Sequence, residues 1–310
     1  MTPNLSDIKT GFPKLDQITG GLGKSDLVLF VSPSSEGTIA LAMNIATHLL
    51  FAKRPQPVLF FSLGISHHEI LSRFIAADAK INLERIRTGS FVRNRWQDLT
   101  ASAARFAEAP LYLNSTCMTA PSIISVSTDL QNKLRGKNES LALIVIDQVR
   151  YLRPCDTRWD LPDHSGASWQ AVHEFMDHTE IAYSLNNSDS ASGDLTATAL
   201  KQLASDLEVT VLALYQHPTP NTKQAKSSLA SSDRLRKIEN DFRNAADIIA
   251  IIDIADHVPQ SVSDARIKVA KNAHGRTGSI SMYFESARSR FTTLDGRSDR
   301  RRDHGDPWGR

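Results

Sequence analysis

Short apolar runs alternate with amphipathic stretches along most of the chain. The early runs are continuously apolar, which is typical of strands covered on both faces in a parallel sheet. Between them, apolar residues recur at helical spacing over Ile65–Ala77 and Arg93–Ala107. The pattern therefore predicts an α/β fold with helices on both faces of a mainly parallel central sheet. The predicted strands are Leu27–Val31, Val58–Leu63, Leu111–Leu113, Leu141–Asp147, Val209–Leu214 and Ile248–Asp253.

Two later runs alternate apolar and polar residues instead. They cover Arg266–Ala270 and Ser279–Phe284, and the sequence HGRTG lies between them. Alternation is typical of strands with one solvated face, and a short glycine-containing turn joins antiparallel neighbours. We predict a C-terminal antiparallel hairpin at the edge of the sheet.

Two segments depart from the alternation of strands and helices. Residues 154–198 are rich in Ser, Asp, Asn and His and include the low-complexity sequence NNSDSASGD, which predicts a long loop. Residues 295–310 are polar and basic, which predicts a disordered tail. We therefore expect one domain over residues 1–294 that carries a long insertion.

Composition restricts the protein class but does not name a partner. The 310 residues are 41% hydrophobic and 23% charged, which suits a soluble domain, and the net charge of +2 neither indicates nor excludes nucleic-acid binding. The two cysteines, Cys117 and Cys155, form no metal or disulfide framework, which favours a reducing cytosol. No signal peptide is visible and no apolar run reaches about 18 residues, so we expect a cytoplasmic protein without a membrane span.

The stretch LVLFVSPSSEGTIALAMN has the layout of a phosphate-binding loop: a buried strand, a turn of small residues and an apolar helix expected to start near Gly37. In such a loop, backbone N–H groups hold phosphate oxygens, a lysine neutralises them and a Ser or Thr hydroxyl holds Mg²⁺. The small residues permit a tight turn that would hold phosphate. By itself the segment favours a plain strand–turn–helix over a working ATP site. The candidate nucleotide-binding positions are Ser34, Ser35, Gly37, Thr38 and Ile39.

The charged and metal-binding groups of a phosphate-binding loop are missing from this stretch. Thr38 stands at the lysine position and Ile39 at the Mg²⁺-ligand position, so neither the positive charge nor the metal-binding oxygen is supplied. Glu36 adds a negative charge beside the place where phosphates would lie. We expect several kcal/mol of phosphate binding to be lost, on the order of the losses measured for buried charge pairs.

Two polar residues follow predicted buried strands. In LALIVIDQVRYL, Asp147 stands at the carboxyl end of a strand, where ligands bind in open α/β sheets, so it is a candidate Walker B residue holding Mg²⁺ through water. In VTVLALYQH, Gln216 would place an amide near a γ-phosphate. The alternatives are an aspartate that caps a turn and a surface glutamine.

Taken together, these segments resemble the C-terminal motor domain of DnaB-type replicative helicases, over most of residues 8–294. The resemblance implies a RecA-like P-loop NTPase fold, ATP and Mg²⁺ as cofactors, single-stranded DNA as a ligand, and a homohexamer or a helicase or other replication protein as partner. Asp147 and Gln216 would be the retained catalytic positions. The likeness is carried by KTGFPKLDQITGGL, SDLVLFVSPSSEGTIALAMN, PVLFFSLGIS, IRTGSFVRNRW, APLYLNST, LIVIDQVRYL and LEVTVLALYQH.

The chain also departs from that family at positions that serve catalysis. Besides Thr38 and Ile39, the position of the family's catalytic glutamate is Gly64. Glu69 lies about one helical turn further on and is a poor substitute. In KNAHG, Lys271 matches a lysine that reaches the γ-phosphate of the neighbouring subunit, but Ala273 stands at the arginine-finger position. The family's N-terminal domain and linker helix are not expected in this sequence.

A DNA contact is predicted by the same resemblance. In the ring helicases, loops near the pore touch the phosphates of single-stranded DNA, and the corresponding region here is SSDRLRKIENDFRNAADI. A solvated basic loop is the alternative, and the absence of interleaved aromatic residues gives no support for base stacking. The candidate phosphate-binding residues are Arg234, Arg236, Lys237 and Arg243.

Three functional hypotheses follow. The first is a DnaB-like protein of DNA replication with little or no ATP hydrolysis, which joins or regulates a helicase ring, because an arginine finger alone is worth about 10³–10⁵ in rate. The second is an active ATP-dependent helicase with an unorthodox site. The third is a RecA-like protein-binding module without a DNA role, working through residues 154–198.

Overall fold

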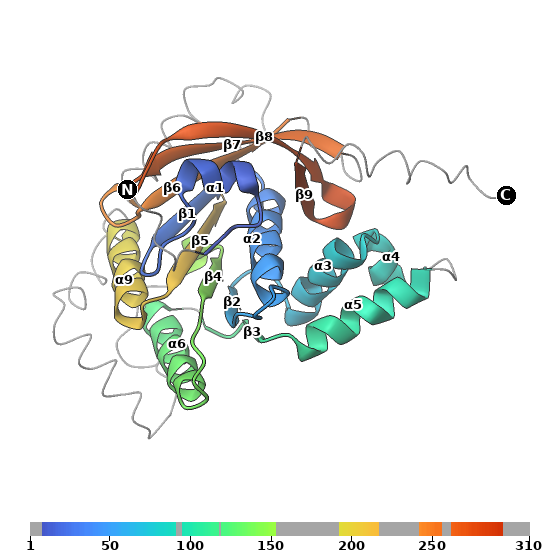
Figure 1. Cartoon of the computed structure of the whole chain (residues 1–310), viewed down its shortest axis with the longest axis horizontal. Coiled ribbons are helices and arrows are strands. Elements are labelled where there is room, and N and C mark those ends of the chain that lie inside the picture. The colour runs from blue at the N-terminus through green and yellow to red at the C-terminus, as the bar shows by residue number, and fades with distance from the viewer. Residues whose placement is uncertain are drawn as a thin grey trace.

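The computed structural model describes residues 8–90, 95–117, 119–152, 192–216, 242–255 and 262–293. These residues form one sheet with the strand order β3-β2-β4-β5-β1-β6-β7-β8-β9 (Figure 1). Strands β1 to β6 pair in parallel, and β7, β8 and β9 continue the sheet in antiparallel pairs. The strands are β1 (Leu27–Ser32), β2 (Val58–Ser62), β3 (Leu111–Asn114), β4 (Leu143–Asp147), β5 (Thr210–Gln216), β6 (Ile248–Ile254), β7 (Val262–Asn272), β8 (Gly278–Glu285) and β9 (Arg290–Thr293).

Helices cover both faces of the sheet. In Figure 1, α3, α4 and α5 are grouped beside the β2–β3 end, whereas α6 and α9 lie on the other side from α2. No helix of the described residues is long and apolar enough to cross a membrane. The helices are α1 (Pro13–Thr19), α2 (Ser35–Leu50), α3 (His67–Ala79), α4 (Leu83–Thr88), α5 (Trp96–Glu108), α6 (Ala120–Arg135) and α9 (Ser192–Leu207), with the short 3₁₀ helices η2 (Val149–Tyr151) and η4 (Ser286–Arg288).

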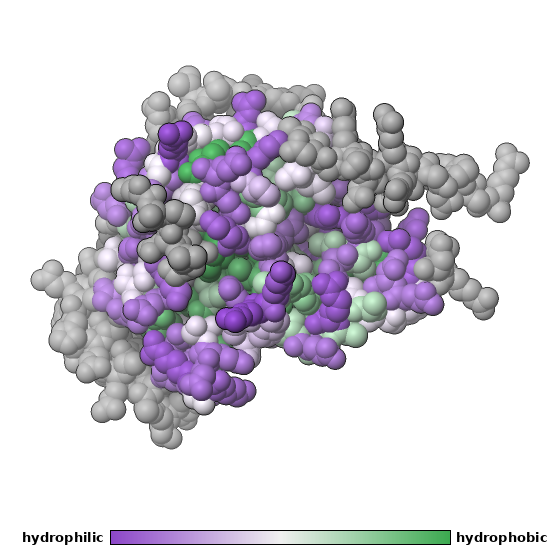
Figure 2. Space-filling model, in the orientation of Figure 1, coloured by the Kyte–Doolittle hydropathy of each residue, from purple (hydrophilic) through white to green (hydrophobic). Residues whose placement is uncertain are grey.

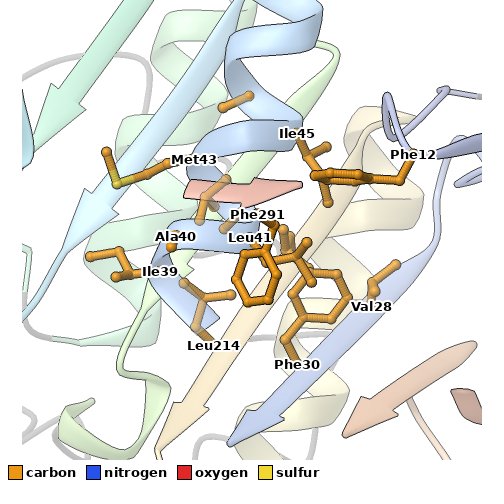
Figure 3. Packing of buried hydrophobic residues seen from close by; sticks show 14 of the residues in the cluster. Phe12, Val28, Phe30, Ile39, Ala40, Leu41, Met43, Ile45, Leu214 and Phe291 are labelled. Carbon is orange, nitrogen blue, oxygen red and sulfur yellow. The ribbon is translucent and has the colours of Figure 1, made fainter. Parts of the chain in front are cut away.

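The sheet separates two apolar cores, and the pleat of each central strand divides its residues between them. In β1, Val28 and Phe30 face the cluster around α2, whereas Leu27, Leu29 and Val31 face the cluster formed with α6 and α9. Figure 3 shows the first cluster packed around α2. Because both faces are buried, every residue of β1 is buried, as the continuous apolar run predicted.

The fold class predicted from the sequence is confirmed, including the C-terminal hairpin. The hairpin is longer than predicted, because β7 extends over Val262–Asn272 and a third antiparallel strand, β9, pairs with β8. On the face in Figure 2, polar side chains cover most of the described surface around a smaller apolar area near its centre.

One predicted boundary is wrong. The predicted loop over residues 154–198 included residues that belong to α9, which begins at Ser192. The helix forms there because Ala197, Leu200 and Leu203 recur at helical spacing and are buried against the sheet. The rest of the predicted insertion, together with Cys155 and the predicted tail, lies outside the described residues.

A stack of aromatic rings attaches the α3–α5 group to the sheet. Phe106 of α5 lies 5.3 Å from Phe74 of α3 and 4.9 Å from Phe51, between ring centroids, and Phe74 in turn meets Phe60 of β2 at 5.9 Å. Arg105 places its guanidinium carbon 4.0 Å from the centre of the Phe51 ring. Edge-to-face pairs of this kind stabilise the fold beyond the area they bury.

We predict that Phe106→Ala lowers the free energy of unfolding by about 3–5 kcal/mol, because the ring is buried and the truncation leaves a cavity. Phe106→Leu should cost less, since it fills most of the space. Denaturant unfolding measures both, with the exposed Val262→Ala as a control that changes stability by less than about 0.5 kcal/mol. A cost below about 1 kcal/mol for Phe106→Ala would show that the stack does not hold α5 in place.

Candidate functional site at the carboxyl edge of the sheet

The parallel strands bring the two retained polar residues to one edge of the sheet. Asp147 lies opposite Ser62 at the end of β2, and Gln216 lies opposite Ser32 at the end of β1. Strand β5 separates β4 from β1, so Asp147 is not directly beside the first loop as the sequence suggested. The predicted meeting of Asp147 and Gln216 at the carboxyl edge is nevertheless what the register produces.

The turn between β1 and α2 is shorter than predicted. Only Pro33 and Ser34 connect the strand end at Ser32 to the helix start at Ser35, two residues before Gly37. The prediction of a tight phosphate-holding turn that includes Ser35 and Gly37 is therefore wrong, because both residues are helical. Within residues 32–37, all of them described, no φ is positive, so the backbone lacks the left-handed residue of an anion-binding nest.

The first turn of α2 turns its side chains into the protein. Thr38 is fully buried and its hydroxyl donates to the Ser35 carbonyl at 3.0 Å, while Ile39 belongs to the apolar core around α2. A Cβ on Gly37 would lie 2.7 Å from Cδ1 of Ile254, so the end of β6 closes over that glycine. Ser34 is the N-cap residue, but its side chain makes no capping hydrogen bond. These residues do not fit Mg²⁺ and ATP in the manner of a phosphate-binding loop.

Asp147 is a buried carboxylate without a compensating partner. Its side chain is 2% exposed, and Oδ1 has no hydrogen-bond partner among the described residues. Its neighbour Ser62 donates instead to the Ile65 carbonyl at 2.7 Å. Burial raises the pKa of Asp147 to about 7, and the positive charge of Arg73 opposes that rise only in part.

Gln148 joins Asp147 to Gln216, which the sequence did not indicate. It adopts a left-handed conformation with φ 64°, which is uncommon for a residue other than glycine, and the chain turns sharply there. Its Nε2 donates to Oε1 of Gln216 at 3.4 Å, while its own Oε1 has no partner among the described residues. The edge thus holds two buried oxygens that accept no hydrogen bond, one on Asp147 and one on Gln148.

The region of the missing catalytic glutamate contains no carboxylate, among the described residues, that is available as a base. Gly64 carries no side chain there, and Glu69 on α3 is bound in an ion-pair network. Arg73 donates its Nε to Glu69 at 2.8 Å, and Arg87 of α4 donates to both Glu69 oxygens. Burial disfavours ionised Glu69, but the hydrogen bonds from Arg87 and Arg73 outweigh it and lower the Glu69 pKa.

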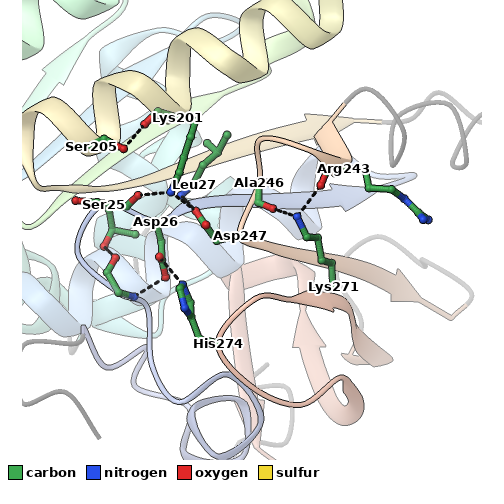
Figure 4. Close-up of polar contacts among 12 residues, drawn as sticks. Ser25, Asp26, Leu27, Lys201, Ser205, Arg243, Ala246, Asp247, Lys271 and His274 are labelled. Carbon is green, nitrogen blue, oxygen red and sulfur yellow. Dashed lines mark hydrogen bonds and ion pairs between the residues drawn. The ribbon is translucent and has the colours of Figure 1, made fainter.

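Lys271 lies at the opposite edge of the sheet from the β1–α2 turn. It pairs with Ile249 near the start of β6, and its ammonium donates to the backbone carbonyls of Arg243 and Ala246 in the same chain (Figure 4). The structure therefore does not bring Lys271 together with the candidate nucleotide positions on α2. Arg243 is exposed. The other predicted DNA contacts, Arg234, Arg236 and Lys237, lie outside the described residues.

The loop after Lys271 is fixed to this amino edge by polar contacts that the sequence did not reveal. His274 Nε2 lies 2.8 Å from Oδ1 of Asp26, and the backbone N–H of Ala273 donates to the Asp247 carbonyl at 2.9 Å. Burial raises the pKa of Asp26, and the hydrogen bond from His274 opposes this. Lys201 donates to Asp247 at 2.7 Å (Figure 4). These contacts join residues far apart in the chain, which local patterns do not indicate.

The comparisons with known proteins agree with this geometry. The model of the DnaB-like helicase C-terminal domain matches residues 7–164 and 175–293. The chain belongs to this family. It is 30% identical over 302 residues to the replicative DNA helicase DnaB of Geobacillus stearothermophilus and 28% identical over 302 residues to the replicative DNA helicase DnaC of Bacillus subtilis. These alignments cover 95% and 96% of this chain, and the chain spans 58% of each relative.

Solved structures confirm the RecA-like fold of a DnaB-type ATPase domain. One solved helicase ATPase domain superposes with a TM-score of 0.72 at 20% identity, over 94% of this chain and 93% of that one. A DnaB-like replicative helicase, solved in a study of its interactions with primase, superposes with a TM-score of 0.71 at 20% identity, over 94% and 62%. At these identities the likeness concerns the fold.

We predict that Asp147→Asn stabilises this DnaB-type domain at pH 8 and not at pH 4. The folded-state pKa of Asp147 is raised from 3.8 to about 7, so the native state binds the proton more tightly than the unfolded state. The free energy of unfolding therefore falls as pH rises from about 4 to about 7, by up to about 4 kcal/mol. Asparagine removes the ionisation and with it this loss.

Denaturant unfolding of both proteins from pH 4 to pH 8 measures the effect. Asp253→Asn, at an exposed carboxylate of β6, is the matched control and should leave the pH dependence of wild type unchanged. Parallel stability curves for wild type and Asp147→Asn would contradict the prediction.

Proposed function

We propose that this DnaB-type domain acts in DNA replication without hydrolysing ATP itself. The family and its named relatives, replicative DNA helicases, support the link to replication. The observation that carries the loss of hydrolysis is the first turn of α2, where Thr38 is buried and hydrogen-bonded to its own helix. A threonine in that state offers neither the charge nor the reach of the lysine that neutralises phosphates.

Each remaining group of the site supports the same proposal. Ile39 contributes an apolar side chain to the core where the metal ligand would be, and Gly64 has no carboxylate to orient a water molecule. Asp147 retains an oxygen without a partner among the described residues, which would suit a cation, but burial keeps its pKa near neutrality and the charge of Arg73 is close by. One acceptor without the phosphate-binding groups does not make a nucleotide site.

The proposed partner is a replicative helicase, in a ring that contains an active DnaB-type subunit. In the family resemblance, a cation of one subunit acts on the nucleotide of the next, at the positions of Lys271 and Ala273. Here Ala273 carries no charge and the Lys271 ammonium is bound to the carbonyls of Arg243 and Ala246. The chain therefore supplies neither its own phosphate-binding lysine nor an arginine finger, and ATP hydrolysis would come from another subunit.

We predict that the purified chain shows no ATP hydrolysis above background, with or without single-stranded DNA. Asp147→Asn is the matched control, because it removes the retained Walker B carboxylate. Any residual rate that comes from a contaminating enzyme will be equal in the two preparations. A DNA-stimulated rate that disappears in Asp147→Asn would contradict the proposal and favour an active helicase with an unorthodox site.

Titration calorimetry with ATP and Mg²⁺ tests binding separately from hydrolysis. We expect no binding at micromolar ATP for wild type, nor for Thr38→Lys/Ile39→Thr, because the two-residue turn and Ile254 remain in place. Binding by the double variant alone would show that the turn still holds phosphate and that only the charge and the metal ligand are missing. Binding by wild type would overturn the assignment of a lost site.

A further inference from the structure

Tyr151 is an aromatic residue exposed at the carboxyl edge. It ends η2, the 3₁₀ helix that follows Asp147 and Gln148, and it is 45% exposed. Among the described residues, the other large apolar side chains this exposed are Trp96 and Val262, which lie on α5 and β7. An aromatic ring left in solvent beside a functional edge is a candidate binding surface.

Arg150 holds a guanidinium group over this ring. Its guanidinium carbon lies 5.0 Å from the centre of the Tyr151 ring, and its Nη1 donates to the backbone carbonyl of Gln216 at 3.4 Å. The side chain thus reaches from the end of β4 to the end of β5 and is oriented at both points. A Cβ on Gly64 would lie 3.8 Å from the Tyr151 ring, so the position without a glutamate leaves that side of the ring without a carboxylate.

The pair lies where the predicted DNA-contacting segment leaves the sheet. β5 ends at Gln216, and the chain from there leads to the basic positions predicted to bind phosphates. The sequence offered no aromatic residue interleaved with those positions, so stacking had no support. The fold supplies one from another part of the chain, since η2 follows β4 and the Arg150 side chain connects it to β5.

We propose that Tyr151 and Arg150 form a contact for single-stranded DNA, in which the Tyr151 ring stacks on a base and Arg150 binds the adjoining phosphate. This inference rests on the proposed role in DNA replication, but it does not depend on the loss of ATP hydrolysis. A stacked base suits a ring that is open on one face and fixed on the other, and stacking tolerates any base. The guanidinium adds a charge-assisted hydrogen bond to phosphate, and no acidic side chain is paired with it among the described residues.

Fluorescence anisotropy with the full chain at low salt tests this contact. The probes are a labelled oligothymidylate and an abasic oligonucleotide of the same length, which keeps the phosphates but has no bases. We expect wild type to bind the oligothymidylate more tightly. Tyr151→Ala should weaken binding of the oligothymidylate about 5- to 100-fold and leave the abasic strand nearly unchanged. Tyr151→Phe, which keeps the ring, should bind like wild type.

Salt dependence separates the role of Arg150 from that of Tyr151. Arg150→Gln should lower the slope of log affinity against log salt by about one, because one phosphate contact is lost, whereas Tyr151→Ala should leave the slope unchanged. Trp96→Ala replaces an equally exposed aromatic residue on α5 and serves as the matched control. Circular dichroism of each variant shows that the fold is retained.

The outcomes that overturn the proposal are distinct from those that overturn the proposed function. Equal affinity of wild type for the two strands, or equal losses for Tyr151→Ala and Trp96→Ala, would exclude stacking on Tyr151. Absence of any binding to single-stranded DNA would overturn the contact as well and leave this edge as a surface for a protein partner. Neither outcome changes the expected absence of ATP hydrolysis, which is measured without these variants.

Discussion

Burial of α2 is the constraint on which the rest of the structure depends. The helix packs along the central parallel strands, and Asn44 in its middle accepts a hydrogen bond from the backbone N–H of Phe291 at 2.7 Å. The same helix therefore holds the parallel sheet and the antiparallel strand β9 together. Because the core requires α2, its position persists whether or not its first turn binds phosphate. Thr38 and Ile39 accordingly serve the core, in a turn where a nucleotide-binding protein would place charged and metal-binding groups.

The carboxyl edge carries an energetic cost that core packing alone does not explain. A buried carboxylate and a buried amide oxygen without partners each reduce stability, by about 1–3 kcal/mol where no donor is supplied. Ser62 and Thr38 have hydroxyl groups near this edge, yet both donate to backbone carbonyls of their own segments. The retained Asp147 is thus maintained against desolvation rather than stabilised by its surroundings, which is typical of positions kept from a binding site.

The sequence predicted the parts of the fold that depend on local patterns. Continuous apolar runs identified the parallel strands, and alternation identified the hairpin, because burial on two faces or one leaves a direct trace in residue order. The start of α2 at Ser35 and the start of α9 at Ser192 were missed, because small polar residues suit a helix N-terminus as well as a loop. The left-handed Gln148 had no signal, since a glycine would have been the expected residue there.

The contacts that define the site could not be predicted, because they join distant segments. Gln148 meets Gln216 across 68 positions, and Arg150 reaches the same residue across 66. Lys271 illustrates the limit most clearly: alignment with the family gives its place in the chain, but only the fold shows its ammonium bound to carbonyls of its own chain.

Together, the two edges restrict how such a subunit can act in a ring. The carboxyl edge lacks the groups that bind phosphate, and the amino-edge loop is fixed by His274 and Lys271 with an alanine between them. In a ring built only from this chain, every interface would lack the phosphate-binding lysine on one side and the arginine finger on the other. In a mixed ring, the nucleotide site of an active neighbour would keep its own lysine and lose only the group contributed across the interface. The chain would then reduce hydrolysis at one interface while the shared fold preserves the ring, so its effect on a helicase would depend on how many subunits it replaces.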